Sequence, residues 1–97
     1  MSTRTAFYRR RFLNRPRHHL GAHVIAEVFV ERPDGRAPGV TATLHLADCN
    51  RCVTIDLDAY DRREAANSLR KIAVLREVIE DLERALNAAI DEVGLRR

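Results

Sequence analysis

The sequence predicts a small α+β domain in which a three-stranded antiparallel β-meander packs against one long C-terminal helix. Apolar and polar residues alternate in short stretches between residues 23 and 57, as in half-buried strands, and recur at helical spacing from residue 61 to residue 94. The 97 residues are 45% hydrophobic, which suits one small globular domain. We therefore expect an N-terminal arm at 1–22 and a β-β-β-α domain at 23–97.

The longest predicted element is a helix between Asp61 and Gly94. Asp61 can act as its N-cap, Glu64 completes a capping-box pattern, and Gly94 stands where a helix-ending glycine belongs. Its apolar residues form an a/d seam in a seven-residue repeat: Ile72, Ile79, Leu86 and Val93 alternate with Leu75, Leu82 and Ala89. The helix is the element against which the other segments are expected to pack.

The strands are predicted from alternation and turn composition. Residues 23–31 place Val24, Ala26, Val28 and Val30 on one face. A turn at 32–39 leads to a second strand, and a tight hairpin with Asn50 and Arg51 at its centre leads to the third. This register places Cys49 opposite Cys52, Leu46 opposite Ile55, Leu44 opposite Leu57, His45 opposite Asp56 and Thr43 opposite Asp58.

The predicted helix is too long for the sheet. It measures about 48 Å at 1.5 Å per residue, whereas strands of about seven residues span about 23 Å. Its C-terminal half therefore has no cover within the chain, and two-fold dimers are the commonest assembly. We expect a homodimer whose interface consists of Leu82, Leu86, Ala89, Ile90 and Val93.

Positive charge gathers at the N-terminus. Residues 1–23 contain six arginines and no acidic residue, whereas acidic side chains outnumber basic ones, 14 against 11, in the remaining chain. Arginine interleaved with aromatic rings suits phosphate contact and base stacking. The candidate nucleic-acid-binding residues are Arg4, Arg9, Arg10, Arg11, Arg15, Arg17, Phe7, Tyr8 and Phe12. Alternatively, the rings pack on the body and the arginines are solvated or pair with its acidic residues.

The sequence predicts no enzyme, metal or cofactor. Cys49 and Cys52 form a C-x-x-C, but zinc needs four ligands and a second such pair is absent, although His18, His19 and His23 could fold over it. We expect the two cysteines to be structural thiols. The predicted His45–Asp56 pair resembles half of a catalytic relay, but no nucleophile stands beside it.

Three resemblances are carried by short segments. The arm–β–β–β–α order, with Arg62-Arg63-Glu64-Ala65-Ala66 opening the helix, is similar to double-stranded-RNA-binding domains, which implies phosphate contacts there. Ala42-Thr43-Leu44-His45-Leu46 and the acidic, leucine-rich helix resemble the second half of bacterial ribosome-hibernation factors. Leu44-His45-Leu46-Ala47-Asp48-Cys49 and Asn67-Ser68-Leu69-Arg70-Lys71-Ile72 look like small uncharacterised proteins of actinobacteria and their phages, which implies no known activity.

Two functions from different classes fit these observations. The first is a non-enzymatic, homodimeric accessory protein that binds nucleic acid through its N-terminal arginines and aromatic residues. The alternative is a protein-interaction module, of the kind that a phage encodes to bind a host or virion protein. The sequence shows no signal-peptide core and no apolar run long enough to span a membrane, so we expect a cytoplasmic protein.

Overall fold

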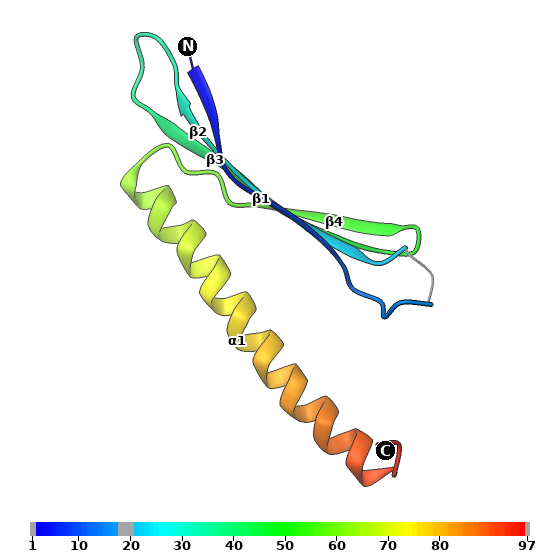
Figure 1. Ribbon diagram of the computed structural model, residues 1–97. Helices are drawn as coiled ribbons and strands as arrows, with labels where there is room; N and C mark the ends of the chain where they lie inside the picture. Colours follow the sequence, from blue (N-terminus) through cyan, green and yellow to red (C-terminus); the bar gives the residue numbers. More distant parts are fainter. Residues whose placement is uncertain (1, 18–20, 97) are drawn as a thin grey trace.

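The computed structural model describes residues 2–17 and 21–96 and contains a four-stranded antiparallel sheet followed by one helix (Figure 1). The elements are β1 (Ser2–Phe12), β2 (His23–Arg32), β3 (Gly39–Asp48), β4 (Arg51–Asp56) and α1 (Arg62–Glu92). Neighbours in sequence are neighbours in the sheet, in the order β1-β2-β3-β4. The predicted α+β class with one C-terminal helix is confirmed, but the sheet has four strands rather than three.

The additional strand comes from the segment predicted as a basic arm. β1 pairs with β2 from Ser2 opposite Arg32 to Phe12 opposite His23, with a bulge between Thr5 and Phe7. This pairing supplies main-chain partners along an edge of β2 that would otherwise be bare. Periodicity did not predict β1 because arginines stand on both of its faces and every residue in it is exposed. Charged residues on an edge strand also oppose pairing with other chains.

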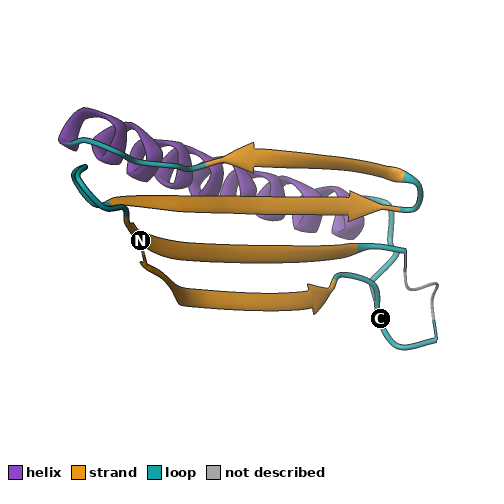
Figure 2. Ribbon diagram, turned by 90° about the horizontal axis from the view of Figure 1, so that it is seen from above, coloured by secondary structure: helices purple, strands orange, loops and turns teal. Residues whose placement is uncertain are grey.

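The strand register divides the side chains between two faces. The inner face, which is turned toward α1, is mostly apolar and carries Phe7, Val24, Ala26, Val28, Val30, Val40, Ala42, Leu44, Leu46, Val53 and Ile55. The outer face carries Tyr8, Arg10, Phe12, His23, Ile25, Glu27, Phe29, Glu31, Thr41, Thr43, His45, Thr54 and Asp56. Seen from above, the four strands lie side by side and α1 is on only one side of the sheet (Figure 2).

The β3–β4 hairpin has a register two residues away from the predicted one. Ala47 is opposite Cys52, and Asp48 is opposite Arg51, so Cys49 and Asn50 are the central residues of the turn. Cys49 takes the left-handed conformation that such a turn requires, with φ 58°. A shift by two residues keeps every side chain on its face, so the apolar pattern could not distinguish the two registers.

This shift changes the predicted cross-strand neighbours. Leu44 is opposite Ile55 instead of Leu57, and Leu46 is opposite Val53 instead of Ile55. His45 is opposite Thr54 and Thr43 is opposite Asp56, so the predicted His45–Asp56 and Thr43–Asp58 pairs are wrong. The predicted partner of Cys49 is also wrong, because Cys49 lies in the turn.

Both ends of α1 agree with the prediction. At the N-terminus, Asp61 Oδ1 accepts a hydrogen bond of 2.8 Å from the Glu64 amide. Glu64 Oε1 in turn accepts one of 2.7 Å from the Tyr60 amide, one residue before the N-cap. At the C-terminus, Gly94 takes φ 72° and Leu95 N–H donates to the carbonyl of Ile90, as in a Schellman motif.

The helix leaves the sheet instead of covering it. α1 starts beside one end of the sheet and diverges from it, so that its C-terminal half projects away (Figure 1), and the chain measures 61 × 28 × 20 Å. The buried apolar residues of the described chain are all small: Ala22, Ala42 and Ala47. The core of this chain is therefore open. In the described part of the chain, no helix has the length and hydropathy needed to cross a bilayer.

Candidate nucleic-acid interface

The candidate residues of β1 do not share one surface. Alternation along the strand places Tyr8, Arg10 and Phe12 on the outer face. Their neighbours Phe7, Arg9 and Arg11 lie on the inner face, where their cross-strand partners are Val28, Ala26 and Val24, and Arg4 joins them opposite Val30. Pairing with β2 therefore divides a set that a free arm would present together.

On the outer face, the residues around Arg10 and Phe12 form a basic and aromatic surface. The cross-strand neighbours of Arg10 on β2, β3 and β4 are Ile25, His45 and Thr54. Those of Phe12 are His23, Ala47 and Cys52. Neither of these cross-strand rows contains an acidic residue. We call the five residues Tyr8, Arg10, Phe12, His23 and His45 the outer patch.

Contacts within the outer patch hold several of its side chains in place. The Arg10 guanidinium carbon lies 5.3 Å from the centre of the Phe12 ring, within the range of a cation–π contact. The rings of His23 and His45 lie 5.7 Å apart, and His45 Nδ1 is 2.9 Å from the Thr54 hydroxyl oxygen. Even so, Tyr8 is 55% exposed and Phe12 is 47% exposed, so both rings remain accessible to a ligand.

Charge is distributed unevenly over the outer face. Its acidic residues are Glu27, Glu31 and Asp56. Glu27 and Asp56 lie in the cross-strand row of Tyr8, and Glu31 lies still farther from Phe12, opposite Thr3. Arg15 and Arg17 follow Phe12 in the chain, and Arg17 takes φ 81°. An anion would therefore be drawn to the end of the outer face where β1 finishes.

The cysteines show no metal site within the described chain. Cys49 and Cys52 are both exposed and are not joined by a disulfide. Among residues 2–17 and 21–96, no three His, Cys, Asp or Glu side chains come together in a way that could hold a metal ion. His18 and His19, the other histidines considered as ligands, lie outside the described residues.

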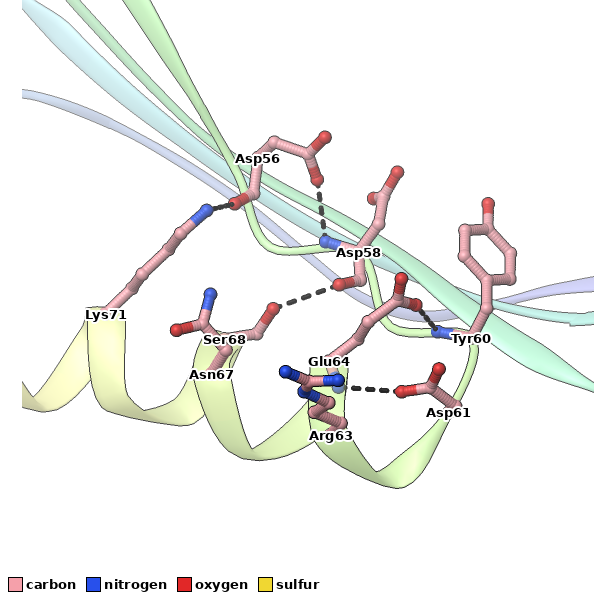
Figure 3. Close-up of a pocket in the computed structure, with 9 residues that line it drawn as sticks. All are labelled: Asp56, Asp58, Tyr60, Asp61, Arg63, Glu64, Asn67, Ser68 and Lys71. Atoms are coloured by element: carbon pink, nitrogen blue, oxygen red, sulfur yellow. Dashed lines mark hydrogen bonds between the residues drawn. The ribbon is translucent and has the colours of Figure 1, made fainter.

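A second polar site, which the sequence analysis did not identify, lies where β4 passes into α1 (Figure 3). Its carboxylates bind backbone amides: Asp56 accepts from the amide of Asp58 at 2.7 Å, and Asp58 accepts from the amide of Ala42 at 2.8 Å. Asp61 and Glu64 form the helix cap described above. Each carboxylate therefore has a structural role in this junction.

Two side chains of α1 complete the junction. Ser68 Oγ donates to the carbonyl of Asp58 at 3.0 Å, and Lys71 Nζ donates to the carbonyl of Asp56 at 2.8 Å (Figure 3). Desolvation, and then the negative charges of Glu31 and Asp58, raise the pKa of the neighbouring Tyr60 hydroxyl. The sequence feature that indicates this turn is the close spacing of Asp56, Asp58 and Asp61, since aspartate favours turns and helix caps.

The predicted interface residues of α1 lie on its projecting half. Leu82, Leu86 and Val93 are 62%, 55% and 64% exposed. Ala89 and Ile90 belong to the same stripe; Ala89 is exposed and Ile90 is partly exposed. These five residues are therefore available to a partner, and whether they bind one stays a prediction.

Comparison of the chain with models of protein families, with curated proteins and with solved structures gives no match.

Proposed function

We propose that this protein is a non-enzymatic accessory protein that binds single-stranded nucleic acid on the outer face of its sheet. The observation that carries the proposal is the outer patch, in which two accessible aromatic rings flank an arginine on one strand. Aromatic rings stack on bases of any sequence, and arginine contacts phosphate. A β-sheet with aromatic residues on its exposed face is a recurrent binding surface for single-stranded nucleic acid.

The distance between the two aromatic rings on β1 determines how a single-stranded nucleic acid would bind. Tyr8 and Phe12 are four residues apart, which is about 13 Å along a strand. The two rings therefore take different bases, and Arg10 between them contacts the intervening backbone. His23 and His45 extend the surface across β2 and β3, and Arg15 and Arg17 continue the positive charge beyond the end of β1.

Fluorescence anisotropy with labelled single-stranded DNA and RNA tests the proposal over a series of salt concentrations. Affinity should fall as salt rises, because phosphate contacts release counterions. Tyr8→Ala and Phe12→Ala should each cost about 1–3 kcal/mol of binding free energy, which is about 5- to 150-fold in affinity. Arg10→Ala should reduce the slope of log affinity against log salt by about 1.

Arg9→Ala is the matched control, because Arg9 is the next residue on the same strand but lies on the inner face. It removes the same charge and should leave affinity close to that of the wild type. Equal losses from Arg9→Ala and Arg10→Ala would instead indicate a free basic arm. No binding of either nucleic acid at low salt would contradict the proposal and leave the protein-interaction module.

A further inference from the structure

This chain exposes far more surface than a compact protein of its size. Its accessible surface is 8304 Å², whereas a folded monomer of its mass has about 5,700 Å². Its radius of gyration is 17.6 Å, against about 12.5 Å for a compact domain of this length. The excess of about 2,600 Å² is comparable with the surface that each subunit buries in a large obligate dimer.

Many of the exposed large apolar side chains lie along α1 and in the space between α1 and the sheet. A cleft between the inner face and the first half of α1 is lined by Phe7, Val28, Leu44, Leu69 and Ile72, among others. It is not filled, because Leu69 is still 69% exposed and Phe7 is 48% exposed. The apolar stripe of the cleft continues along α1 as the a/d seam to Val93.

The charges of α1 indicate what occupies this cleft. Residues 62–76 contain five basic side chains and one acidic one, whereas residues 77–93 contain six acidic side chains and one basic one. Two such helices attract each other when they run antiparallel, since each positive half then lies beside a negative half. A parallel pair would place like charges together. Arg9 and Arg11 add positive charge to the inner face, the face on which Phe7 lines the cleft.

We propose that the cleft binds the C-terminal half of α1 from a second copy of this chain. The two α1 helices run antiparallel about a two-fold axis near Glu77 and Val78, the middle of the helix. Half of a 31-residue helix is about 23 Å long, so it fits within the length of the ten-residue strands β2 and β3, which span about 33 Å. Each chain gives and receives the same segment, as a two-fold interface requires.

The second copy is favoured over an unrelated protein because this chain already contains both halves of the match. The apolar cleft, which has the basic first half of α1 as one wall, and the acidic, apolar second half of α1 occur in the same chain, and each is left uncovered in the single chain. The arrangement also leaves the outer face of both sheets open. It therefore does not depend on the function proposed for the outer patch.

Sedimentation equilibrium and chemical cross-linking test the proposal. The wild-type protein should have the mass of two 11.1 kDa chains. In a background of Cys49→Ser and Cys52→Ser, Ala66→Cys and Ala89→Cys place one thiol near each end of α1. A bismaleimide cross-linker should join an Ala66→Cys chain to an Ala89→Cys chain when the two variants are refolded together.

Neither single-thiol variant should cross-link to itself, because antiparallel pairing separates identical ends of the two helices. Links within each variant alone, without links in the mixture, would indicate parallel helices and overturn the proposal. A wild-type mass of one chain at tens of micromolar would overturn it as well, and this measurement needs no variant.

Discussion

The two halves of α1 are chemically different surfaces on one helix. The first half is tied to the sheet through the junction: Asp61 caps it, Lys71 donates to the carbonyl of the last residue of β4, and Ser68 donates to a carbonyl two residues later. The second half has the same apolar seam but projects away from the sheet. Regular helical structure is therefore not a sign that an element is packed, because its main-chain hydrogen bonds are satisfied locally.

The two halves of α1 therefore have different structural roles. Directed hydrogen bonds at the junction set where the helix starts and how it leaves the sheet. The projecting half offers apolar surface, whose burial is favourable whatever the orientation of the partner, so it suits contact with another apolar surface. Changes in the projecting half should therefore affect assembly, whereas changes to the hydrogen bonds of the junction should affect the stability of the fold.

The largest effect is expected in the projecting half, from Leu86→Glu. The new carboxylate would stand in the seam and would cost about 3–5 kcal/mol per chain if it were buried without a partner. Since Leu86 is 55% exposed in the single chain, the fold itself should tolerate the change. Light scattering should show a folded protein with the mass of one chain.

Ala88→Glu is the control for this variant. It adds the same charge two residues away, about 200° around the helix and so on the opposite face. It should leave the mass of the assembly unchanged. If Leu86→Glu remained dimeric, or if both variants dissociated equally, the seam would not be the interface.

A smaller effect is expected at the start of the helix, from Asp61→Ala. Losing the N-cap should reduce the free energy of unfolding by about 1 kcal/mol, and by up to about 2. For a domain of this size, 1 kcal/mol corresponds to a fall in Tm of about 4–8 °C. Asp61→Ser should restore most of the loss, since serine is also a good N-cap. A Tm unchanged in Asp61→Ala would show that the cap does not hold the junction.

The smallest effect is expected from Ser68→Ala, within the same junction. The change leaves the partly buried carbonyl of Asp58 without this donor and should cost about 1 kcal/mol of stability. Asn67→Ala, at the neighbouring exposed position, is the control and should have a smaller effect on thermal unfolding. Equal effects would mean that the hydrogen bond from Ser68 contributes nothing specific. Neither change should alter nucleic-acid binding, because the outer patch lies on the other face of the sheet.

The sequence by itself determined the helix, its two ends and the faces of three strands. Asp61 and Gly94 act through their immediate neighbours, so their roles can be recognised without the fold. Alternation likewise assigned Val24, Ala26 and Val28 to one face, because the period of a strand does not depend on its partner.

Only the tertiary structure decided which strands pair and in which register. The hairpin register moved by two residues, a change that leaves the faces intact and so has no signature in the apolar pattern. β1 became a strand because β2 offered an unpaired edge, a long-range effect that no local property of Arg9, Arg10 and Arg11 predicts. The same pairing divided those arginines between two faces, and it therefore determines which of them can share a ligand.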